Sequence, residues 1–239
     1  MSVVNKGNIM SNTVPVIDFA SVLASTVHDM KNSLCMLIQS TELIQQERQQ
    51  LSDSAQDELA RLNYEANRLN SNLLQLLSLY RFERNQLPVQ IDEHYLPDIT
   101  EEVLLKNQFY TEQRKLQITL EQSADLYWFF DYDLIVNLLN DAVANALRYC
   151  NSRILLKITQ LQQKLLIEVH DDGPGFPTFM LNSDALDMNT PDLANNHTGL
   201  GIFFAKLIAG AHTNKGERGT VNLTNGGELG GGVFRLTLP

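Results

Sequence analysis

The heptad pattern around His28 predicts that its imidazole is exposed to water rather than buried in a core. Apolar residues around His28 recur at alternating steps of four and three, the heptad spacing of a helix that packs against other helices. The positions of this seam are Leu23, Val27, Met30, Leu34, Leu37 and Ile44, with Thr41 in the remaining slot. His28 directly follows a seam position, on the flank that leans toward water. Asp29 is its neighbour, and Asn32 lies one helical turn further along the same face.

The chemistry available to this stretch is nucleophilic. An exposed imidazole titrates near neutral pH, so its uncharged nitrogen can attack an electrophile. An adjacent carboxylate such as Asp29 can orient the ring or accept its proton. An ordinary surface histidine on a coiled-coil helix fits the same residues, and this stretch alone leaves that alternative open.

A second group of polar residues recurs at helical spacing much later in the chain. Asp141 and Asn145 lie one turn apart, and Arg148 follows three residues further on. A carboxylate, an amide oxygen and a guanidinium on one face of a helix can hold a magnesium ion and the phosphates that it bridges. A polar stripe on a half-buried helix is the competing interpretation.

Two glycine-rich stretches follow. The stretch Asp171–Gly175 comes directly after a predicted strand, where a carboxylate can accept a hydrogen bond from an exocyclic amine and glycines let the backbone approach a flat ring. The stretch Thr198–Gly201 opens a predicted helix, whose first N–H groups can face a phosphate. Each stretch alone also fits a common turn or helix cap.

The elements around the histidine predict a long helical hairpin. We expect a first helix from a cap at Asp18 to about residue 50, and then a turn with an N-cap at residues 52–54. The second helix has a matching seam at Ala55, Leu59, Leu62, Ala66, Leu69, Leu73, Leu76 and Tyr80. Two such helices form an antiparallel hairpin, and their surplus apolar surface predicts a homodimer built as a four-helix bundle. The alternative is a hairpin that packs only on the chain's own second domain.

A change of periodicity after residues 85–88 predicts the domain boundary. Beyond it we expect strands at 89–91, 116–120, 127–130, 154–159, 164–170, 220–224 and 233–238. Helices are expected at 96–114, 131–149 and 202–211, with a glycine-punctuated segment at 171–201. The predicted fold class is α+β, with a flexible tail at 1–15, the helical hairpin at 16–86 and an α/β sandwich at 87–239.

Composition narrows the partners and the compartment. The net charge of −10 argues against nucleic acid or an anionic membrane surface as the partner, because both need basic patches. Cys35 and Cys150 are too few for a disulfide framework and indicate small thiols, at least half buried, in a reducing compartment. The apolar runs are far short of a membrane span and no signal peptide opens the chain, so we expect a cytoplasmic protein.

In their order and spacing, these stretches resemble the bacterial two-component sensor histidine kinases, whose catalytic domain shares its ATP-binding fold with DNA gyrase, Hsp90 and MutL. The resemblance covers nearly the whole chain from Asp18 onward. It rests on His28–Asn32 as the phosphoacceptor box, Asn145–Tyr149 as the asparagine box, Asp171–Gly175 and Thr198–Gly201 as two glycine boxes, and Gly231–Phe234 with the final Leu238-Pro239 as the terminal strand.

The resemblance implies a mechanism that uses ATP and Mg²⁺. His28 would attack the γ-phosphate with Asp29 as base, and would pass the phosphoryl group to an aspartate of a response regulator receiver domain. Asn32 would help to orient water in the reverse, phosphatase, reaction. Asn145 would ligate the metal, and Asp171 would bind the adenine amine. The residues implied at the nucleotide are Asp141, Asn145, Arg148, Tyr149, Asp171, Gly173, Gly175, Thr198, Gly199, Leu200 and Gly201.

Several residues depart from the family's pattern. His197 stands just before the second glycine box, where glycine is usual, which leaves the phosphate loop less free to wrap. Residues 176–197, which would form the mobile lid over ATP, show no clear phenylalanine box, contain no Lys or Arg, and carry Asp184, Asp187 and Asp192. Asp141 stands where the kinases more often have asparagine, while the related ATPases have an acid that activates water. These departures leave the rate of ATP turnover open.

Three alternatives remain beside the kinase. A phosphotransferase would relay phosphate through His28 on a degenerate ATP domain; the intact Asp171 and Asn145 count against it, and the acidic lid counts for it. A regulator could act mainly as a phosphatase of a response regulator, for which Asn32 and nucleotide binding suffice. An ATPase that only changes shape would use Asp141 as base and leave His28 idle.

Because no sensor region, membrane span or receiver domain fits this length, we expect the input from a separate sensor protein or through the short N-terminal tail.

Overall fold

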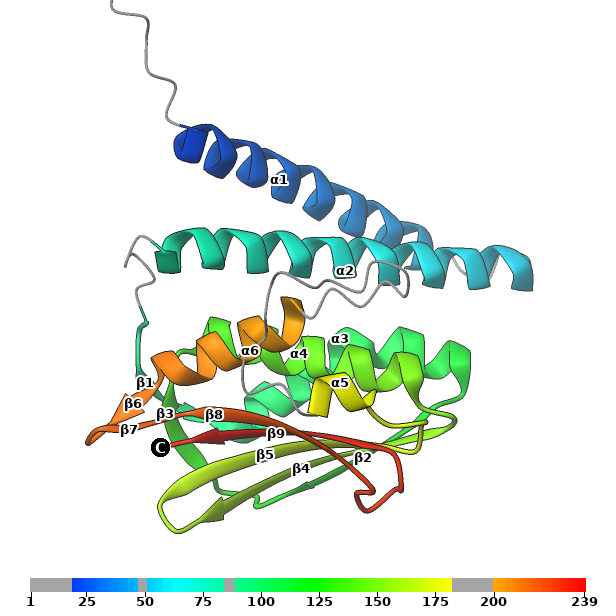
Figure 1. The fold of residues 1–239 in the computed structure, drawn as a ribbon. Coiled ribbons are helices and arrows are strands. Elements are labelled where there is room, and N and C mark those ends of the chain that lie inside the picture. The colour runs from blue at the N-terminus through cyan, green and yellow to red at the C-terminus, as the bar shows by residue number, and fades with distance from the viewer. Residues whose placement is uncertain (1–18, 47–50, 84–88, 182–199) are drawn as a thin grey trace, which may run out of the picture.

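The chain folds into a helical hairpin and a layered α/β domain that contact each other (Figure 1). The computed structural model describes residues 19–46, 51–83, 89–181 and 200–239. The helices are α1 (Phe19–Gln46), α2 (Asp53–Glu83), α3 (Leu96–Arg114), α4 (Tyr132–Tyr149), α5 (Thr178–Leu181) and α6 (Leu200–Ala211). The strands are β1 (Asp92–Tyr95), β2 (Gln117–Gln122), β3 (Tyr127–Phe130), β4 (Arg153–Leu161), β5 (Lys164–Asp171), β6 (Thr213–Asn214), β7 (Glu217–Arg218), β8 (Thr220–Asn225) and β9 (Gly232–Leu238).

Three layers follow one another in Figure 1: the hairpin, then α3, α4 and α6, and then a five-stranded sheet. The strand order is β2-β4-β5-β9-β8, and β2 pairs with β4 in parallel while the other three pairs are antiparallel. The parallel pair needs a crossover connection, which β3 and α4 supply. Strands β1 and β3 form a separate two-stranded sheet, and β6 and β7 form a short hairpin. The mixed α/β architecture agrees with the predicted fold class.

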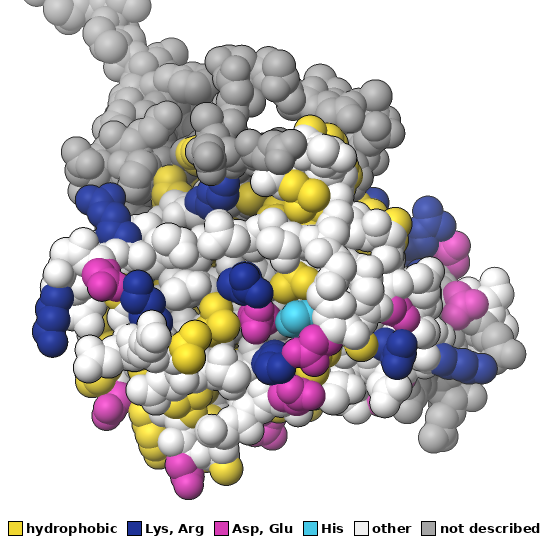
Figure 2. Space-filling view, turned by 60° about the horizontal axis from the view of Figure 1, so that its bottom comes forward, with side chains coloured by type: hydrophobic (Ala, Val, Ile, Leu, Met, Phe, Trp, Pro, Cys, Tyr) yellow, Lys and Arg dark blue, Asp and Glu magenta, His cyan; other side chains and the backbone are white. Residues whose placement is uncertain are grey.

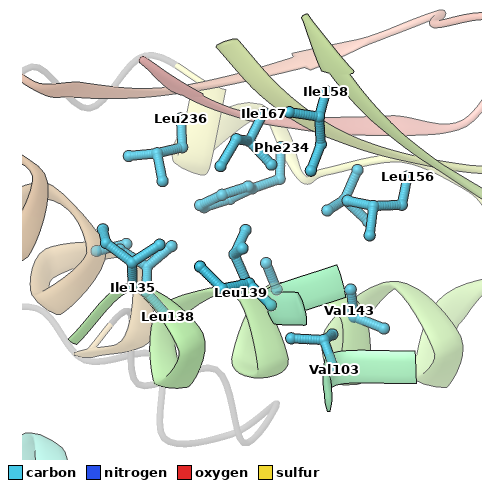
Figure 3. Close-up of a cluster of buried hydrophobic side chains, with 14 of the residues drawn as sticks. Val103, Ile135, Leu138, Leu139, Val143, Leu156, Ile158, Ile167, Phe234 and Leu236 are labelled. Atoms are coloured by element: carbon cyan, nitrogen blue, oxygen red, sulfur yellow. The ribbon is translucent and has the colours of Figure 1, made fainter. Parts of the chain in front are cut away.

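The core of the α/β domain fills the space between the sheet and its helices, as Figure 3 shows. Alternate side chains of the central strands point toward α4, because successive residues of a strand lie on opposite faces. Leu156, Ile158 and Ile167 from the sheet meet Leu139 and Val143 from α4, and each of the five is at most 1% exposed. Residues four apart on α4 therefore form one apolar stripe that fixes which face of this helix turns toward the sheet.

The opposite face of the sheet carries a row of alternating charges. Glu121, Lys157, Glu168 and Arg235 are direct cross-strand neighbours on β2, β4, β5 and β9. Lys157 Nζ lies 3.5 Å from Glu121 Oε2, and Arg235 Nη2 lies 2.7 Å from Glu168 Oε1. Figure 2 shows acidic and basic side chains gathered around a histidine on this side of the molecule. Opposite charges directly across a pair of strands stabilise the sheet by roughly 0.2–1 kcal/mol each, so this face is suited to contact with water.

Alternate positions of each described heptad seam are buried or half-buried, and the positions between them are exposed. Val27 and Thr41 of α1 are buried with Leu59 and Ala66 of α2. The alternate seam positions are 38% to 56% exposed, and they are Met30, Leu37, Ile44, Leu62, Leu69 and Leu76. Asn63 Nδ2 donates a hydrogen bond of 3.1 Å to Thr41 Oγ1 across the two helices. The two seams of the hairpin therefore meet each other with only part of their apolar surface.

A buried carboxylate and a buried imidazole connect the ends of α4 and α6. Asp131 caps α4 by accepting from Leu134 N at 3.0 Å through Oδ1, and it accepts from Gln90 N at 2.9 Å through Oδ2. The amide of Asp131 donates to His212 Nε2 at 3.0 Å, while His212 Nδ1 donates to Ile208 O at 2.8 Å. This arrangement needs the neutral ring, and burial lowers the pKa of His212 in agreement with it.

The first predicted strand is wrong, and its capping contact explains why. The sequence predicts a strand at Val89–Ile91, whereas β1 is Asp92–Tyr95, where it pairs with β3. The amide of Gln90 is occupied by Asp131, so the apolar alternation at 89–91 marks a contact with the start of α4. The other predicted strands and helices of this domain are present, with ends shifted by at most two residues. The tail at 1–15, the Asp18 cap and the boundary at 85–88 lie outside the described residues.

The two cysteines are at least half buried, as the sequence predicts. Cys35 is half-buried, Cys150 is buried, and both are free thiols. Burial raises the pKa of Cys150, so this thiol is uncharged near neutral pH. None of the described helices combines the length and the apolar character that a bilayer crossing requires.

Leu139→Ala tests the packing of α4 on the sheet. We expect the free energy of unfolding to fall by about 2–5 kcal/mol, because the substitution leaves a cavity at a fully buried position. Denaturant unfolding followed by circular dichroism measures the change. The control is Leu161→Ala on β4, where the side chain is 61% exposed and a much smaller loss is expected. Equal losses for the two variants would contradict this account of the core.

Candidate functional site

Helix α4 presents one stripe to the core and the opposite stripe to a cavity. Leu139 and Val143 face the sheet, while Asp141 and Asn145 lie on the other side of the helix. The cavity has a volume of about 1090 Å³ and lies between α4, the end of β5, α6, α3 and helix α2 of the hairpin. The predicted site residues that line it are Asp141, Asn145, Arg148, Tyr149, Asp171, Gly175 and Gly201.

The remaining predicted residues of this site stand as follows. Gly173 and Leu200, the first residue of α6, do not line the cavity. Thr198 and Gly199 lie outside the described residues, as do His197 and the three aspartates of the predicted lid. The cavity thus brings together the α4 stripe, the first glycine stretch and the described end of the second, although they are far apart in the sequence.

The carboxylate of Asp171 is buried at the end of β5 and is held by backbone amides. Its Oδ1 accepts from Gly173 N at 2.8 Å and from Gly232 N at 3.1 Å, and its carbonyl accepts from Gly231 N at 3.0 Å. The described residues give Oδ2 no hydrogen bond. Since Asp171 also lines the cavity, Oδ2 is available to accept one from a ligand.

The first glycine stretch needs glycine for two different reasons. A Cβ at Gly173 would lie 2.3 Å from the carbonyl oxygen of Tyr149, so the turn packs directly against the end of α4. Gly175 has a φ of +81°, in the left-handed region that favours glycine, and lies at the cavity. The turn therefore brings bare backbone to the site.

The carboxylate of Asp172, the residue after Asp171, makes hydrogen bonds that stabilise the fold. It accepts from Asn151 N at 2.8 Å and from Ser152 N and Oγ at 3.0 and 2.7 Å, and so binds the turn between α4 and β4. Burial alone would raise the pKa of Asp172, but the hydrogen bonds from Ser152, Arg153 and Asn151 lower it to about 2. Asp172 therefore stays ionised and fixes the end of α4 relative to the end of β5.

Arg148 lies where the hairpin meets the α/β domain. Its guanidinium carbon is 5.4 Å from the ring centre of Tyr149. Tyr64 of α2 stacks on Tyr110 of α3 with ring centres 4.9 Å apart. Burial raises the pKa of the Tyr64 hydroxyl, and the nearby charge of Arg148 partly offsets this rise. The aromatic stack thus joins α2 to α3 beside the cavity.

His28 lies on the exposed flank of α1, and its polar neighbours meet one side of the ring. Asp29 Oδ1 is 3.7 Å from His28 Nδ1, and Asn32 Nδ2 is 3.3 Å from the same atom. The described residues give Nε2 no partner. Lys31, in the next turn, lines the cavity, but His28 does not.

The sequence patterns did not predict some of the residues that form the cavity. Phe176 lines the cavity, and its backbone is bound by the side chain of Asn225 from the end of β8. Tyr64 and Arg68 line the cavity from α2. The polar run of α2 off its heptad seam is a signal for the α2 residues, whereas no local pattern indicates Asn225, because its contact joins segments far apart in the chain.

The comparisons with known proteins agree with this geometry. Residues 130–239 match the family described as histidine kinase-, DNA gyrase B- and HSP90-like ATPase. The sensor protein RstB of Escherichia coli is 29% identical over 188 residues, which cover 74% of this chain and 40% of RstB. The chain thus spans about two fifths of the length of the curated relatives that it matches.

Solved histidine kinases have the same fold. The Acinetobacter baumannii histidine kinase AdeS superposes with a TM-score of 0.57 at 20% identity, over 87% of this chain and 95% of that one. Full-length ShkA in complex with AMPPNP superposes with a TM-score of 0.60 at 17% identity, over 92% of this chain and 46% of that one. Both alignments extend across the hairpin as well as the α/β domain.

Asp172→Asn tests the anchor between α4 and β5. Because the folded state lowers the carboxyl pKa from 3.8 to about 2, the carboxylate contributes stability that is fully present above pH 3.8 and is lost as the pH falls toward 2. We expect the variant to lose about 1–2 kcal/mol of unfolding free energy near neutral pH, and the difference from wild type to shrink below pH 3.8. Urea unfolding at several pH values measures this. Asp125→Asn, in an exposed turn, controls for the charge change; a pH-independent difference would contradict the assignment.

Proposed function

We propose that the protein phosphorylates its own His28 with ATP. Residues 130–239 match the histidine kinase-, DNA gyrase B- and HSP90-like ATPase family. The chain is also a relative of the two-component sensor histidine kinases. The observation that carries the proposal is the cavity where the α4 stripe meets the carboxylate of Asp171. The hairpin that bears His28 borders the same cavity through α2 and Lys31.

The cavity fits a nucleotide in its donor and acceptor groups. Asp171 Oδ2 is an acceptor suited to the exocyclic amine of adenine, and Gly175 offers bare backbone to the flat ring. Arg148 would supply a cation for phosphates, and the start of α6, where Gly201 lines the cavity, would supply N–H groups. The complex of ShkA with AMPPNP supports ATP as the ligand class.

A magnesium ion would bind beside Asn145. Asn145 is exposed on the cavity side of α4, with Asp141 one turn before it. In the described parts of the chain, no three His, Cys, Asp or Glu side chains gather closely enough to hold a metal ion. One or two protein oxygens suit magnesium that keeps its remaining sites for phosphate oxygens and water. The bound ion would neutralise charge on the transferred phosphoryl group.

Asp29 and Asn32 favour opposite tautomers of His28. A carboxylate at Nδ1 favours the ring with its proton on Nδ1, which leaves a lone pair on Nε2 for attack. An amide N–H donated to Nδ1 favours the other tautomer, in which Nε2 carries the proton and is not nucleophilic. In the kinase reaction Asp29 would have to close on Nδ1 from its present 3.7 Å and replace Asn32 there, which would select the reactive form of the ring.

The reaction has one bond made and one broken. His28 Nε2 would form a bond to the γ-phosphorus of ATP while the bond to the β–γ bridging oxygen breaks and ADP leaves. The ring proton at Nδ1 would pass to Asp29 or to water. Because His28 does not line the cavity in this conformation, the reaction requires the α/β domain to move along the hairpin, or a second protomer's site to reach His28.

The phosphoryl group would then pass to an aspartate of a response regulator receiver domain. The exposed flank of α1 around His28 leaves the phosphohistidine open to such a partner. Because the relatives are named sensor proteins, we propose that this activity responds to an input signal.

A second protomer would cover the exposed half of the hairpin. The uncovered seam positions of α1 and α2 recur every seven residues, so they form continuous apolar stripes on both helices. Two hairpins that bury these stripes against each other make a four-helix bundle. We therefore include a homodimer in the proposal.

A phosphatase of the response regulator is the second candidate function. The carboxamide of Asn32 lies beside the ring of His28 on the exposed flank, where it can orient a water toward a phosphorylated partner. This function needs nucleotide binding but no transfer to His28.

Incubation with magnesium and γ-labelled ATP tests the kinase. We expect an acid-labile, base-stable label on the wild type, its reduction to background in His28→Ala, and a reduction of about tenfold or more in Asp171→Asn, because a charge-assisted hydrogen bond to the nucleotide is lost. Asp125→Asn is the matched control and should label normally.

Each other outcome points to a different function. A label that survives His28→Ala would rule out His28 as the acceptor. Nucleotide binding without a label on the wild type would favour the phosphatase, and the absence of nucleotide binding would favour a phosphotransferase with a degenerate ATP domain. ATP turnover that persists without a label and stops in Asp141→Asn would favour the shape-changing ATPase.

Leu37→Glu tests the dimer. The variant places a charge in the centre of the proposed interface, so we expect its dimer dissociation constant to rise by about tenfold or more. Sedimentation equilibrium measures this constant. Gln39→Glu makes a similar charge change two residues away, on the opposite side of α1, and should leave the dimer intact. A monomeric wild type, or equal behaviour of the two variants, would contradict the interface.

A further inference from the structure

The side chain of Asn225 binds both backbone groups of one residue at the cavity. Its Oδ1 accepts from Phe176 N at 2.7 Å, and its Nδ2 donates to Phe176 O at 2.9 Å. A carboxamide thus stands in for a neighbouring strand and pairs with Phe176 as one backbone residue pairs with another. Asn225 ends β8, while Phe176 belongs to the segment that leaves the first glycine turn.

The same carboxamide fits against Gly175. A Cβ at this glycine would lie 2.7 Å from Oδ1 and 2.9 Å from Nδ2 of Asn225, so the amide occupies the space beside the bare Cα. Gly175 also has the left-handed backbone conformation, with φ of +81°. Because Gly175 and Phe176 both line the cavity, Asn225 fixes two consecutive residues of its wall.

The turn that follows Asn225 gives this contact a rigid base. On the cavity side, the amides of Gly231 and Gly232 bind Asp171. On the outer face of the sheet, Glu228 N lies 3.4 Å from His170 Nδ1, and Glu228 Oε1 lies 2.6 Å from Lys157 Nζ. The turn is therefore held from both faces of the sheet.

We propose that Asn225 is a positioning residue for nucleotide binding, which fixes Gly175 and Phe176 at the cavity beside Asp171. The inference rests on the proposed nucleotide function of this cavity and assigns a role to a residue outside its wall. Both the donor and the acceptor of the carboxamide are needed. Aspartate keeps the acceptor but sets a negative charge against the carbonyl oxygen of Phe176, and alanine removes both groups.

Binding of ADP to the full chain, measured by isothermal titration calorimetry, tests the proposal. ADP separates binding from phosphoryl transfer. We expect Asn225→Ala to bind ADP about tenfold more weakly than the wild type, because two hydrogen bonds that order the cavity wall are lost. Asn225→Asp should weaken ADP binding at least as much. If only the size of the side chain mattered, this variant would bind ADP normally. Asn222→Ala, on the same strand and also exposed, is the matched control and should bind normally.

Hydrogen–deuterium exchange identifies the cause of the loss. The peptide that contains Phe176 should exchange faster in both Asn225 variants without nucleotide, while the thermal midpoint stays close to that of the wild type. Unchanged ADP affinity, or unchanged exchange of this peptide, overturns the positioning role while the nucleotide function stands. If the wild type binds no ADP, the nucleotide function fails and the inference falls with it.

Discussion

The buried carboxylate of Asp171 is the contact on which the site depends. A buried charge is stable only when hydrogen bonds replace the water it has lost, and Asp171 obtains them from the amides of Gly173 and Gly232. Gly173 lies in the turn after β5, and Gly232 lies where the glycine-rich turn passes into β9, so two turns far apart in the sequence meet at Asp171. Asp172 binds a third turn, between α4 and β4. Two successive carboxylates therefore gather the chain around the end of β5, and the cavity wall follows from that arrangement.

Packing decides what each helix offers to the cavity. The apolar stripe of α4 commits one face to the sheet, which leaves the polar stripe with Asp141 and Asn145 on the other. The hairpin forms another wall of the cavity, where α2 contributes Tyr64 and other polar side chains. The stack of Tyr64 on Tyr110 joins the two parts of the chain at this border. The position of His28 relative to the cavity therefore depends on how firmly α2 holds the α/β domain.

Local patterns predict most of the fold, because they reflect local physics. The helix at 96–114 has the predicted ends, and strands such as β3 follow from their alternation and length. The parts that local patterns miss depend on contacts distant in sequence. The alternation at 89–91 is the same whether the amide of Gln90 pairs with a strand or with Asp131, and only the fold decides. Likewise, the heptads predict the seams but not which half the hairpin covers, and nothing near Asn225 indicates its contact with Phe176.

The row of charges across the sheet also affects the protein's colloidal behaviour. Glu121, Lys157, Glu168 and Arg235 alternate in sign, so this row is neutral in a chain of net charge −10. Long-range repulsion between molecules in solution must then come mainly from other surfaces. Close stacking of two such sheets would remove water from these four paired ions, and the dehydration of ion pairs costs free energy. This cost opposes stacking even at high salt, where the repulsion between net charges is screened.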